Sequence, residues 1–140
     1  MNIRSALSIG NKILIQNDII SHKLDSELLM SKVINKNREF IILNLDKKIN
    51  EKNFHKYNQL INERSQGKPI AYIFGKKYFW RNEFLVNEKV LIPRPDTEIL
   101  VEEIIKITKN KEKLNVLEIG VGSGCLLLSL LIEKKYFKGT

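Results

Sequence analysis

Apolar residues recur every three or four positions through residues 1–66, which is the spacing of one face of an α-helix. Clusters of asparagine, glycine and charged residues interrupt the pattern, so it predicts several short helices. The first helix follows Asn2 and breaks near Gly10, and the second begins near Asp25 with Ser21 or Asp25 as its cap. Two more are predicted over residues 38–45 and 51–65. Their apolar stripes predict a small helical bundle, and the stripe residues of the first two helices are Ile3, Leu7, Ile13, Leu14, Leu24, Leu28, Leu29 and Val33.

The pattern changes after residue 66. The stretch Gly67–Gly75 begins with a glycine and a proline and ends with a second glycine, so it predicts a boundary between domains. Residues 76–80 and 84–86 are β-prone runs around Arg81-Asn82-Glu83, which is the outline of a hairpin. Phe79 and Trp80 are candidates for a substrate platform, but aromatic residues in a hairpin more often pack between domains, and packing is the preferred interpretation.

A proline-rich segment precedes the next predicted helix. Pro93 and Pro95 stand one residue apart, which favours an extended backbone and ends any preceding element. The helix over residues 96–108 has acidic residues toward its start and lysines near its end, an order that suits the helix dipole. Leu100, Val101, Ile104 and Ile105 give it an apolar face that suits packing on a sheet.

The most informative stretch is rich in glycine. Asn115–Ile119 predicts a short buried strand, Gly120, Gly122 and Gly124 a tight turn, and residues 125–135 a helix. Cys125 occupies the place of the third glycine of a dinucleotide fingerprint, and no Gly-Lys-Ser/Thr follows for a phosphate loop. Glu118 at the end of the strand gives an order that resembles the first motif of S-adenosylmethionine-dependent methyltransferases. The alternative is a glycine-rich connection in some other α/β domain.

Composition narrows the class of protein. A chain of 140 residues has room for about one domain, or for one small domain and part of another. A hydrophobic fraction of 43% and a charged fraction of 29% are typical of soluble globular proteins. No apolar run is long enough for a membrane span and no signal peptide is present, so we expect a cytoplasmic protein with no membrane partner. One cysteine and two histidines predict neither a disulfide nor a metal site.

The net charge is +8 and the isoelectric point about 9.6, which suits an acidic partner such as nucleic acid. The lysines are scattered along the sequence and greatly outnumber the arginines, and the chain is also rich in isoleucine and asparagine. Such a composition has a simple origin in AT-rich coding. Direct binding of nucleic acid is therefore the less favoured interpretation.

Several segments, taken in order, resemble the HemK/PrmC family of protein glutamine methyltransferases. They are Gly67-Lys-Pro-Ile-Ala-Tyr-Ile-Phe-Gly75, the pair Phe79-Trp80, Val90-Leu-Ile-Pro-Arg-Pro-Asp-Thr-Glu98 and Val116-Leu-Glu-Ile-Gly-Val-Gly-Ser-Gly124. Leu24–Leu29 followed by Arg38-Glu39-Phe40 resembles the N-terminal domain of the family. The resemblance covers nearly the whole chain, and the segment from Ile92 to Glu98 is its most discriminating part.

The resemblance implies an α/β organisation in three parts. Residues 1–66 would form a helical substrate-recognition domain, residues 67–92 a linker with the hairpin, and residues 93–140 the first part of a Rossmann-like methyltransferase domain. It implies S-adenosylmethionine as cofactor and class I peptide chain release factors as partners, methylated on the glutamine side-chain amide of their Gly-Gly-Gln motif. The implied cofactor-binding residues are Arg94, Pro95, Thr97, Glu118, Ile119, Gly120, Val121, Gly122 and Gly124.

Two of these positions carry qualifications. The family more often has aspartate where this chain has Glu118, a change that keeps the charge and lengthens the side chain. Arg94 has an alternative role as a structural hinge that pairs with Asp96 or Glu98.

The Asn-Pro-Pro-Tyr motif with which the family grips the glutamine amide is absent, so no catalytic residue is assigned within this chain. The sequence ends directly after the predicted first strand and helix of the methyltransferase domain, and we expect it to be the N-terminal portion of a longer enzyme, inactive alone. One alternative is a nucleic-acid methyltransferase acting on DNA adenine or tRNA guanine, because base amino groups can use a similar pocket. Another is a non-enzymatic helical interaction module with a nucleotide-like appendage.

Overall fold

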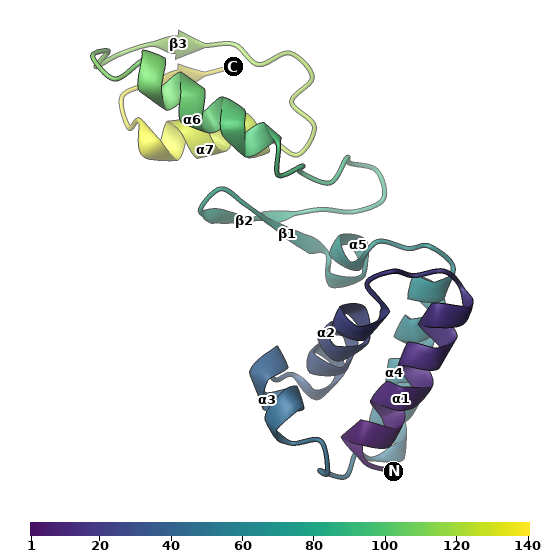
Figure 1. Cartoon of the computed structure of the whole chain (residues 1–140). Helices are drawn as coiled ribbons and strands as arrows, with labels where there is room; N and C mark the ends of the chain where they lie inside the picture. Colours follow the sequence, from purple (N-terminus) through teal and green to yellow (C-terminus); the bar gives the residue numbers. More distant parts are fainter. The chain divides into compact units, whose positions relative to one another are not determined.

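The computed structural model describes residues 1–140 and divides into two compact units, residues 1–74 and 75–140, here called the helical unit and the mixed unit. Figure 1 shows the elements of each. The helical unit contains α1 (Ile3–Gln16), α2 (His22–Ile34), α3 (Arg38–Leu43), α4 (Glu51–Ser65) and α5 (Ile70–Phe74). The mixed unit contains β1 (Lys76–Phe79), β2 (Asn82–Leu85), α6 (Thr97–Ile107), β3 (Asn115–Val116), α7 (Cys125–Glu133) and β4 (Lys138–Gly139).

The four helices predicted before residue 66 are confirmed, and asparagine side chains begin three of them. Asn2, Asn37 and Asn50 each accept a hydrogen bond from the backbone amide three residues later, at 2.9, 3.0 and 2.8 Å. These bonds satisfy amides that the first turn of a helix leaves unpaired. Asn35 ends α2 in the left-handed conformation, with φ of 55°.

A fifth helix, α5, was not predicted. It packs on α4, and Ile70, Ile73 and Phe74 join the apolar core of the bundle. The Lys32 ammonium lies 4.9 Å from the centre of the Phe74 ring. A helix of five residues is too short to show a helical period in the sequence, so only its packing reveals it. The helical unit therefore extends past Gln66 to Phe74.

The predicted break at Gly10 is wrong, because α1 runs through it without interruption. Gly10 is buried where α1 meets α4, and a methyl group added there would clash with the Tyr57 ring and approach Ile61 Cδ1 to 2.9 Å. The glycine lets the two helices come close together. Glycine has a low helix propensity, and the close packing of α1 on α4 offsets this cost.

The buried face of α2 also differs from the predicted stripe. Leu24 is exposed, whereas Ser26, Leu29, Met30 and Val33 face the core at helical spacing. The sequence hid this face because one of its members is a serine. Its hydroxyl lies 2.6 Å from the Tyr57 hydroxyl, and this hydrogen bond makes the burial of both polar groups tolerable.

Asp25 forms the most buried ion pair of the helical unit. Its carboxylate accepts a hydrogen bond from Arg64 Nε at 2.7 Å and another from the Ser21 hydroxyl at 2.7 Å. The Arg64 guanidinium also donates to the Lys68 carbonyl at 3.4 Å. The two side chains are only 6% and 16% exposed. The pair thus ties the start of α2 to the end of α4 inside the bundle.

Burial of Tyr57 predicts a loss of stability at alkaline pH. Its desolvation raises the pKa of the phenol from 10.0 to about 12, although the Ser26 hydrogen bond opposes the rise. The folded state then holds this proton more tightly than the unfolded state. Its stabilising contribution is complete below pH 10 and is lost as the pH rises toward 12.

For a rise of that size the loss is at most about 2.7 kcal/mol. The measurement is urea unfolding followed by far-ultraviolet circular dichroism between pH 9 and pH 12. Lysines titrate in the same range, so Tyr57→Phe is the control. The variant should lose distinctly less stability over this range, and equal losses for both chains would contradict the prediction.

The predicted hairpin is confirmed in the mixed unit. β1 and β2 pair antiparallel, with Phe79 opposite Asn82. Phe79 and Phe84 meet edge to face and pack with Val101 of α6 and Leu130 of α7. The hairpin therefore belongs to the core of this unit.

Trp80 in the hairpin turn is held by two glutamates. Its backbone amide donates to Glu98 at 2.7 Å, and its indole N–H donates to Glu133 at 2.8 Å. Arg81 also pairs with Glu133, at 3.1 Å. Phe79 and Trp80 thus pack as the preferred interpretation expects, but their contacts are with α6 and α7 of the same unit and not between domains.

The predicted buried strand over residues 115–119 is wrong in length and in burial. β3 covers Asn115–Val116, and Leu117 and Ile119 are 70% and 90% exposed. A parallel strand is buried when layers cover both faces of its sheet, and this sheet has two strands with α7 between them in sequence. The expectation that the sequence ends directly after the first strand and helix is also corrected, because a short second strand, β4, pairs parallel with β3.

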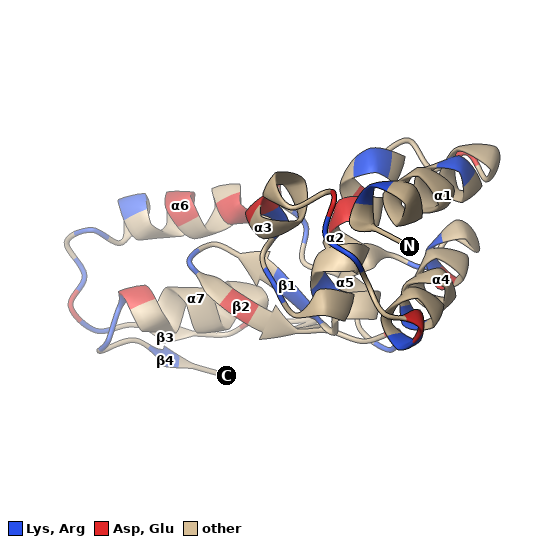
Figure 2. Ribbon diagram, turned by 90° about the horizontal axis from the view of Figure 1, so that it is seen from below, with Lys and Arg blue, Asp and Glu red and all other residues tan.

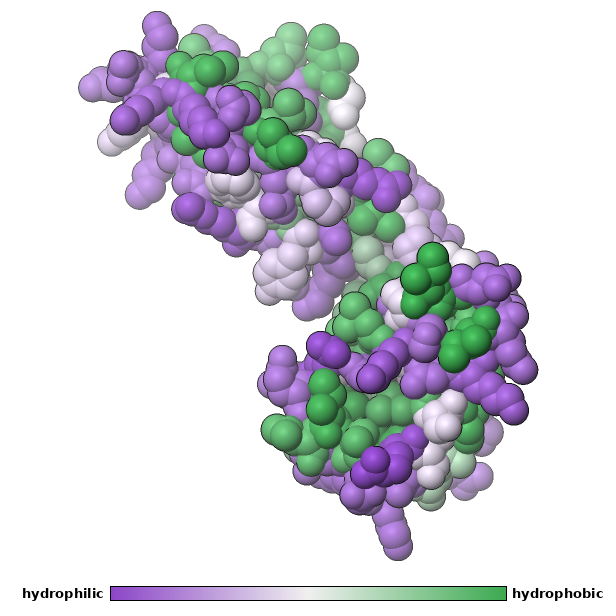
Figure 3. Space-filling model, viewed as in Figure 1, coloured by the Kyte–Doolittle hydropathy of each residue, from purple (hydrophilic) through white to green (hydrophobic).

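Apolar residues remain at the surface of both units, as the green regions of Figure 3 show. None of the helices combines the length and the apolar composition that a membrane span requires.

Candidate functional site

The glycine-rich turn joins β3 to α7 at the carboxyl end of the strand. Gly120, Gly122 and Gly124 have φ of 79°, 56° and 74°, a backbone conformation that side-chain-bearing residues rarely adopt. The Gly124 amide closes the turn by donating to the Val121 carbonyl at 2.8 Å. Gly124 then stands at the start of α7. The three glycines therefore provide the sharp reversal from strand to helix.

The turn leaves its backbone open on one side. A side chain built on Gly120 would meet no atom within 4 Å, and one on Gly122 would meet only the Gly120 carbonyl, at 3.9 Å. Gly124 is different, because Leu128 Cδ1 would lie 3.2 Å away. Gly120 and Gly122 thus offer bare backbone that a ligand can approach closely.

Glu118 lies beside the first turn of α7. Its Oε2 accepts a hydrogen bond from the Leu127 amide at 3.1 Å, and its own amide donates to the Thr140 carbonyl at 2.9 Å. A carboxylate is favoured there by the unpaired amides and the positive end of the helix dipole. No hydrogen bond satisfies the amides of Cys125 and Leu126, so two donors stay available at the same helix end. The sequence analysis did not predict these free amides, although a helix that starts at Gly124 leaves the amides of its first turn unpaired.

The remaining predicted residues of the turn are apolar and reach solvent. Ile119 is 90% exposed and Val121 42% exposed. Together with the bare backbone of Gly120 and Gly122, they give the turn an apolar rim. Such a rim suits a ligand that is partly apolar.

The second group of predicted residues lies where the chain enters α6. Arg94 and Pro95 are exposed and Thr97 is half-buried. The Thr97 amide donates to the Arg94 carbonyl at 3.1 Å, so the segment bends into the helix after an irregular stretch. Arg94 forms no ion pair with Asp96 or Glu98. Glu98 instead accepts a hydrogen bond from the Trp80 amide. The alternative role of Arg94 as a structural hinge is therefore not supported.

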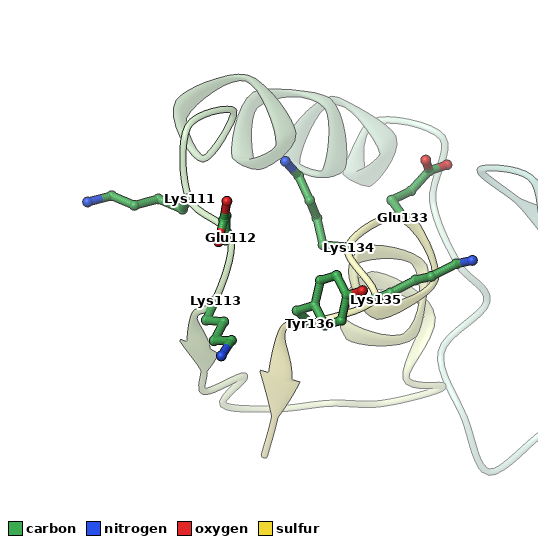
Figure 4. A pocket seen from close by; sticks show the side chains of 7 residues that line it. All are labelled: Lys111, Glu112, Lys113, Glu133, Lys134, Lys135 and Tyr136. Carbon is green, nitrogen blue, oxygen red and sulfur yellow. The ribbon is translucent and has the colours of Figure 1, made fainter.

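A hollow of about 580 Å³ lies at the other end of the two strands. Lysines from the α6–β3 and α7–β4 connections line it together with Tyr136, as Figure 4 shows. In open α/β sheets, cofactors bind at the carboxyl ends of the strands, where the glycine turn lies. The hollow is at the amino ends, so it is not the candidate cofactor site.

Comparison with known proteins adds a family model and named relatives. Residues 5–75 match the model of the PrmC N-terminal domain, which covers almost the whole helical unit. The release factor glutamine methyltransferase of Leptospira interrogans is 39% identical over 135 residues, which cover 96% of this chain and 47% of that protein. The enzyme of the same name from Buchnera aphidicola is 45% identical over 109 residues, covering 77% and 39%.

A protein called bifunctional methyltransferase, from Rickettsia conorii, is 36% identical over 156 residues, covering 94% of this chain and 30% of that protein. The chain thus spans less than half the length of these curated relatives. The alignments with the Leptospira and Rickettsia proteins cover nearly all of this chain, so they extend beyond the helical unit.

Proposed function

The chain belongs to the PrmC family, and we propose that it serves in the methylation of class I peptide chain release factors. The proposed target is the glutamine side-chain amide of their Gly-Gly-Gln motif. The proposed methyl donor is S-adenosylmethionine. The observation that carries this proposal is the match of the helical unit to the PrmC N-terminal domain. The names of the Leptospira and Buchnera relatives support the activity. We also predict a cytoplasmic location, because translation terminates in the cytoplasm.

The glycine turn is the proposed site for the methionine part of the cofactor. That part carries an ammonium group and a carboxylate. Glu118 uses one carboxylate oxygen for the Leu127 amide and keeps the other for an ammonium group. The unpaired amides of Cys125 and Leu126 suit a carboxylate at the start of α7.

The other residues have proposed supporting roles in the same site. Ile119, Val121 and the three glycines would contact the cofactor through bare backbone and apolar side chains. The segment with Arg94, Pro95 and Thr97 would pass beside the methionine end. The parallel pair β3 and β4 with α7 between them is the kind of unit with which a Rossmann-like domain is built.

The helical unit is the proposed recognition module for the release factor. It is a compact unit distinct from the one that carries the glycine turn, and it is the part that matches the PrmC N-terminal domain. The hairpin and the following loop would form the connection between recognition and catalysis.

The transfer itself requires positioning more than acid-base chemistry. The sulfonium of the cofactor is a strong methyl donor, whereas an amide nitrogen is a poor nucleophile because its lone pair is delocalised into the carbonyl. An enzyme must therefore align the nitrogen with the methyl group and hold the amide by hydrogen bonds. The Asn-Pro-Pro-Tyr motif would provide those bonds, and it is absent from these 140 residues.

We therefore predict that residues 1–140 alone transfer no methyl group. The measurement is incorporation of label from methyl-labelled S-adenosylmethionine into a release factor. Incorporation above the level without protein, abolished when the acceptor glutamine is replaced by alanine, would contradict this prediction.

The cofactor site can be tested in a chimera in which these 140 residues replace the matching part of the Leptospira enzyme. At a ligand concentration of about 100 times the dissociation constant, S-adenosylmethionine should stabilise the chimera by about 2.7 kcal/mol, seen as a higher melting temperature. No stabilisation at saturating cofactor would count against every methyltransferase interpretation. It would favour a non-enzymatic helical interaction module.

A nucleic-acid methyltransferase is the second candidate, because amino groups of DNA adenine or tRNA guanine can occupy an amide-binding pocket. The helical unit and its family match favour the protein substrate. Acceptor preference separates the two, since both require the same cofactor.

A further inference from the structure

Lysines far apart in the sequence gather at one edge of the mixed unit. β3 and β4 are parallel, so the connections that precede them lie at the same end of the sheet. Figure 2 shows basic residues in both connections. The interpretation of the lysines as scattered is wrong for this group, which consists of Lys109, Lys111 and Lys113 before β3, Lys134 and Lys135 before β4, and Lys138 at the start of β4.

Two acidic residues, Glu112 and Glu133, line the hollow beside four lysines. Glu133 is held by the Trp80 indole and by Arg81, so it offsets little of the lysine charge. Lys111, Lys113 and Lys135 form no ion pair. The edge therefore carries an excess of positive charge, and Lys111, Lys113 and Lys135 are free to meet an anionic partner.

The hollow of about 580 Å³ opens between the two connections and is called the basic hollow. In Figure 4, Lys111, Glu112 and Lys113 come from the connection before β3, and Lys134 and Tyr136 from the connection before β4; the Lys111 side chain points away from Tyr136. Tyr136 is 73% exposed, so most of its ring is accessible to a ligand. Lys134 is held in place, since its ammonium donates to the Thr108 carbonyl at 3.3 Å.

We infer that the basic hollow binds single-stranded nucleic acid. Lysines from both connections at this edge suit a phosphate backbone that passes along it. The exposed face of Tyr136 suits a base that stacks on it, which requires bases free of a duplex. Proteins that bind single strands without sequence preference combine these two features, a basic groove and an aromatic platform. This binding is separate from the proposed methyl transfer, because the glycine turn lies at the opposite ends of the strands.

The test measures fluorescence anisotropy of a labelled oligouridylate of about 12 nucleotides, titrated with the 140-residue chain at several salt concentrations. The variant Lys111→Gln/Lys113→Gln should reduce the slope of log affinity against log salt concentration by about 1.4. The matched control is Lys52→Gln/Lys56→Gln, which removes the same charge from exposed positions of α4. An equal reduction in this control would overturn the inference, because the binding would then depend on net charge alone.

Substitutions of Tyr136 provide an independent part of the test. Tyr136→Ala should weaken binding by about fivefold to a hundredfold, while Tyr136→Phe keeps the ring and the affinity. A duplex of the same length should bind more weakly than the single strand. Unchanged affinity in Tyr136→Ala, or preference for the duplex, would overturn the inference. No arm uses S-adenosylmethionine or a release factor, so failure here leaves the proposed methyl transfer untouched.

Discussion

Replacing Arg64 by methionine is expected to lower the free energy of unfolding of the helical unit by about 3–5 kcal/mol. The change leaves the Asp25 carboxylate, 6% exposed, without its cationic partner inside the bundle. Ser21 still donates one hydrogen bond to it, but a neutral hydroxyl compensates a buried charge poorly. The measurement is chemical unfolding of the whole chain followed by far-ultraviolet circular dichroism.

The chain offers a matched control for this prediction. Arg4 and Asp46 form an ion pair at 3.2 Å whose side chains are 60% and 81% exposed, so Arg4→Met should cost at most about 1 kcal/mol. The double variant Asp25→Leu/Arg64→Met should recover much of the loss, because it removes both charges. The prediction fails if Arg64→Met costs no more than Arg4→Met.

A second large effect is expected at the glycine turn. In the chimera with the Leptospira enzyme, Glu118→Gln should weaken binding of S-adenosylmethionine by about tenfold to a hundredfold, which corresponds to a charge-assisted hydrogen bond of about 1.5–3 kcal/mol. Glutamine can still accept the Leu127 amide, so the fold of the turn should persist. The change isolates the charge that the ammonium group of the cofactor would meet.

Isothermal titration calorimetry measures this affinity directly. Glu112→Gln is the control, because it removes an exposed carboxylate of the same unit at the other end of the strands. Unchanged affinity in Glu118→Gln, or an equal loss in Glu112→Gln, would remove Glu118 from the proposed site.

The helices could be predicted from the sequence because their signals are local. Asn37 and Asn50 cap the helices that the apolar spacing predicts, and Asn35 ends one in a conformation that asparagine tolerates. The hairpin followed from β-prone runs on each side of a polar turn. The glycine turn followed from three glycines in five residues, all with positive φ.

The remaining features depend on partners distant in the sequence. Gly10 looks like a helix break in the sequence, but Tyr57 packs against it, and Ser26 looks like a surface residue, but its hydroxyl shares a hydrogen bond with that of the same tyrosine. Lys111 and Lys134 are far apart in the sequence, but the parallel pair of strands brings their loops together. In each case tertiary contact overrides a local pattern.

The exposed end of the predicted strand has a similar cause. Leu117 and Ile119 have the composition of a buried parallel strand, but burial requires layers on both faces, and a period in the sequence does not report those layers. Glu118 could be assigned to the site from its position, whereas the free amides of Cys125 and Leu126 required the geometry of the helix end.

The most direct test of the proposed function is methyl transfer by the chimera. A class I release factor, the same factor with alanine in place of the Gly-Gly-Gln glutamine, and a mixture of DNA and tRNA are offered as acceptors with methyl-labelled S-adenosylmethionine. We expect label in the first acceptor alone, located by mass spectrometry on the side-chain amide of that glutamine. Label in the nucleic acids and none in the release factor would contradict the proposed function.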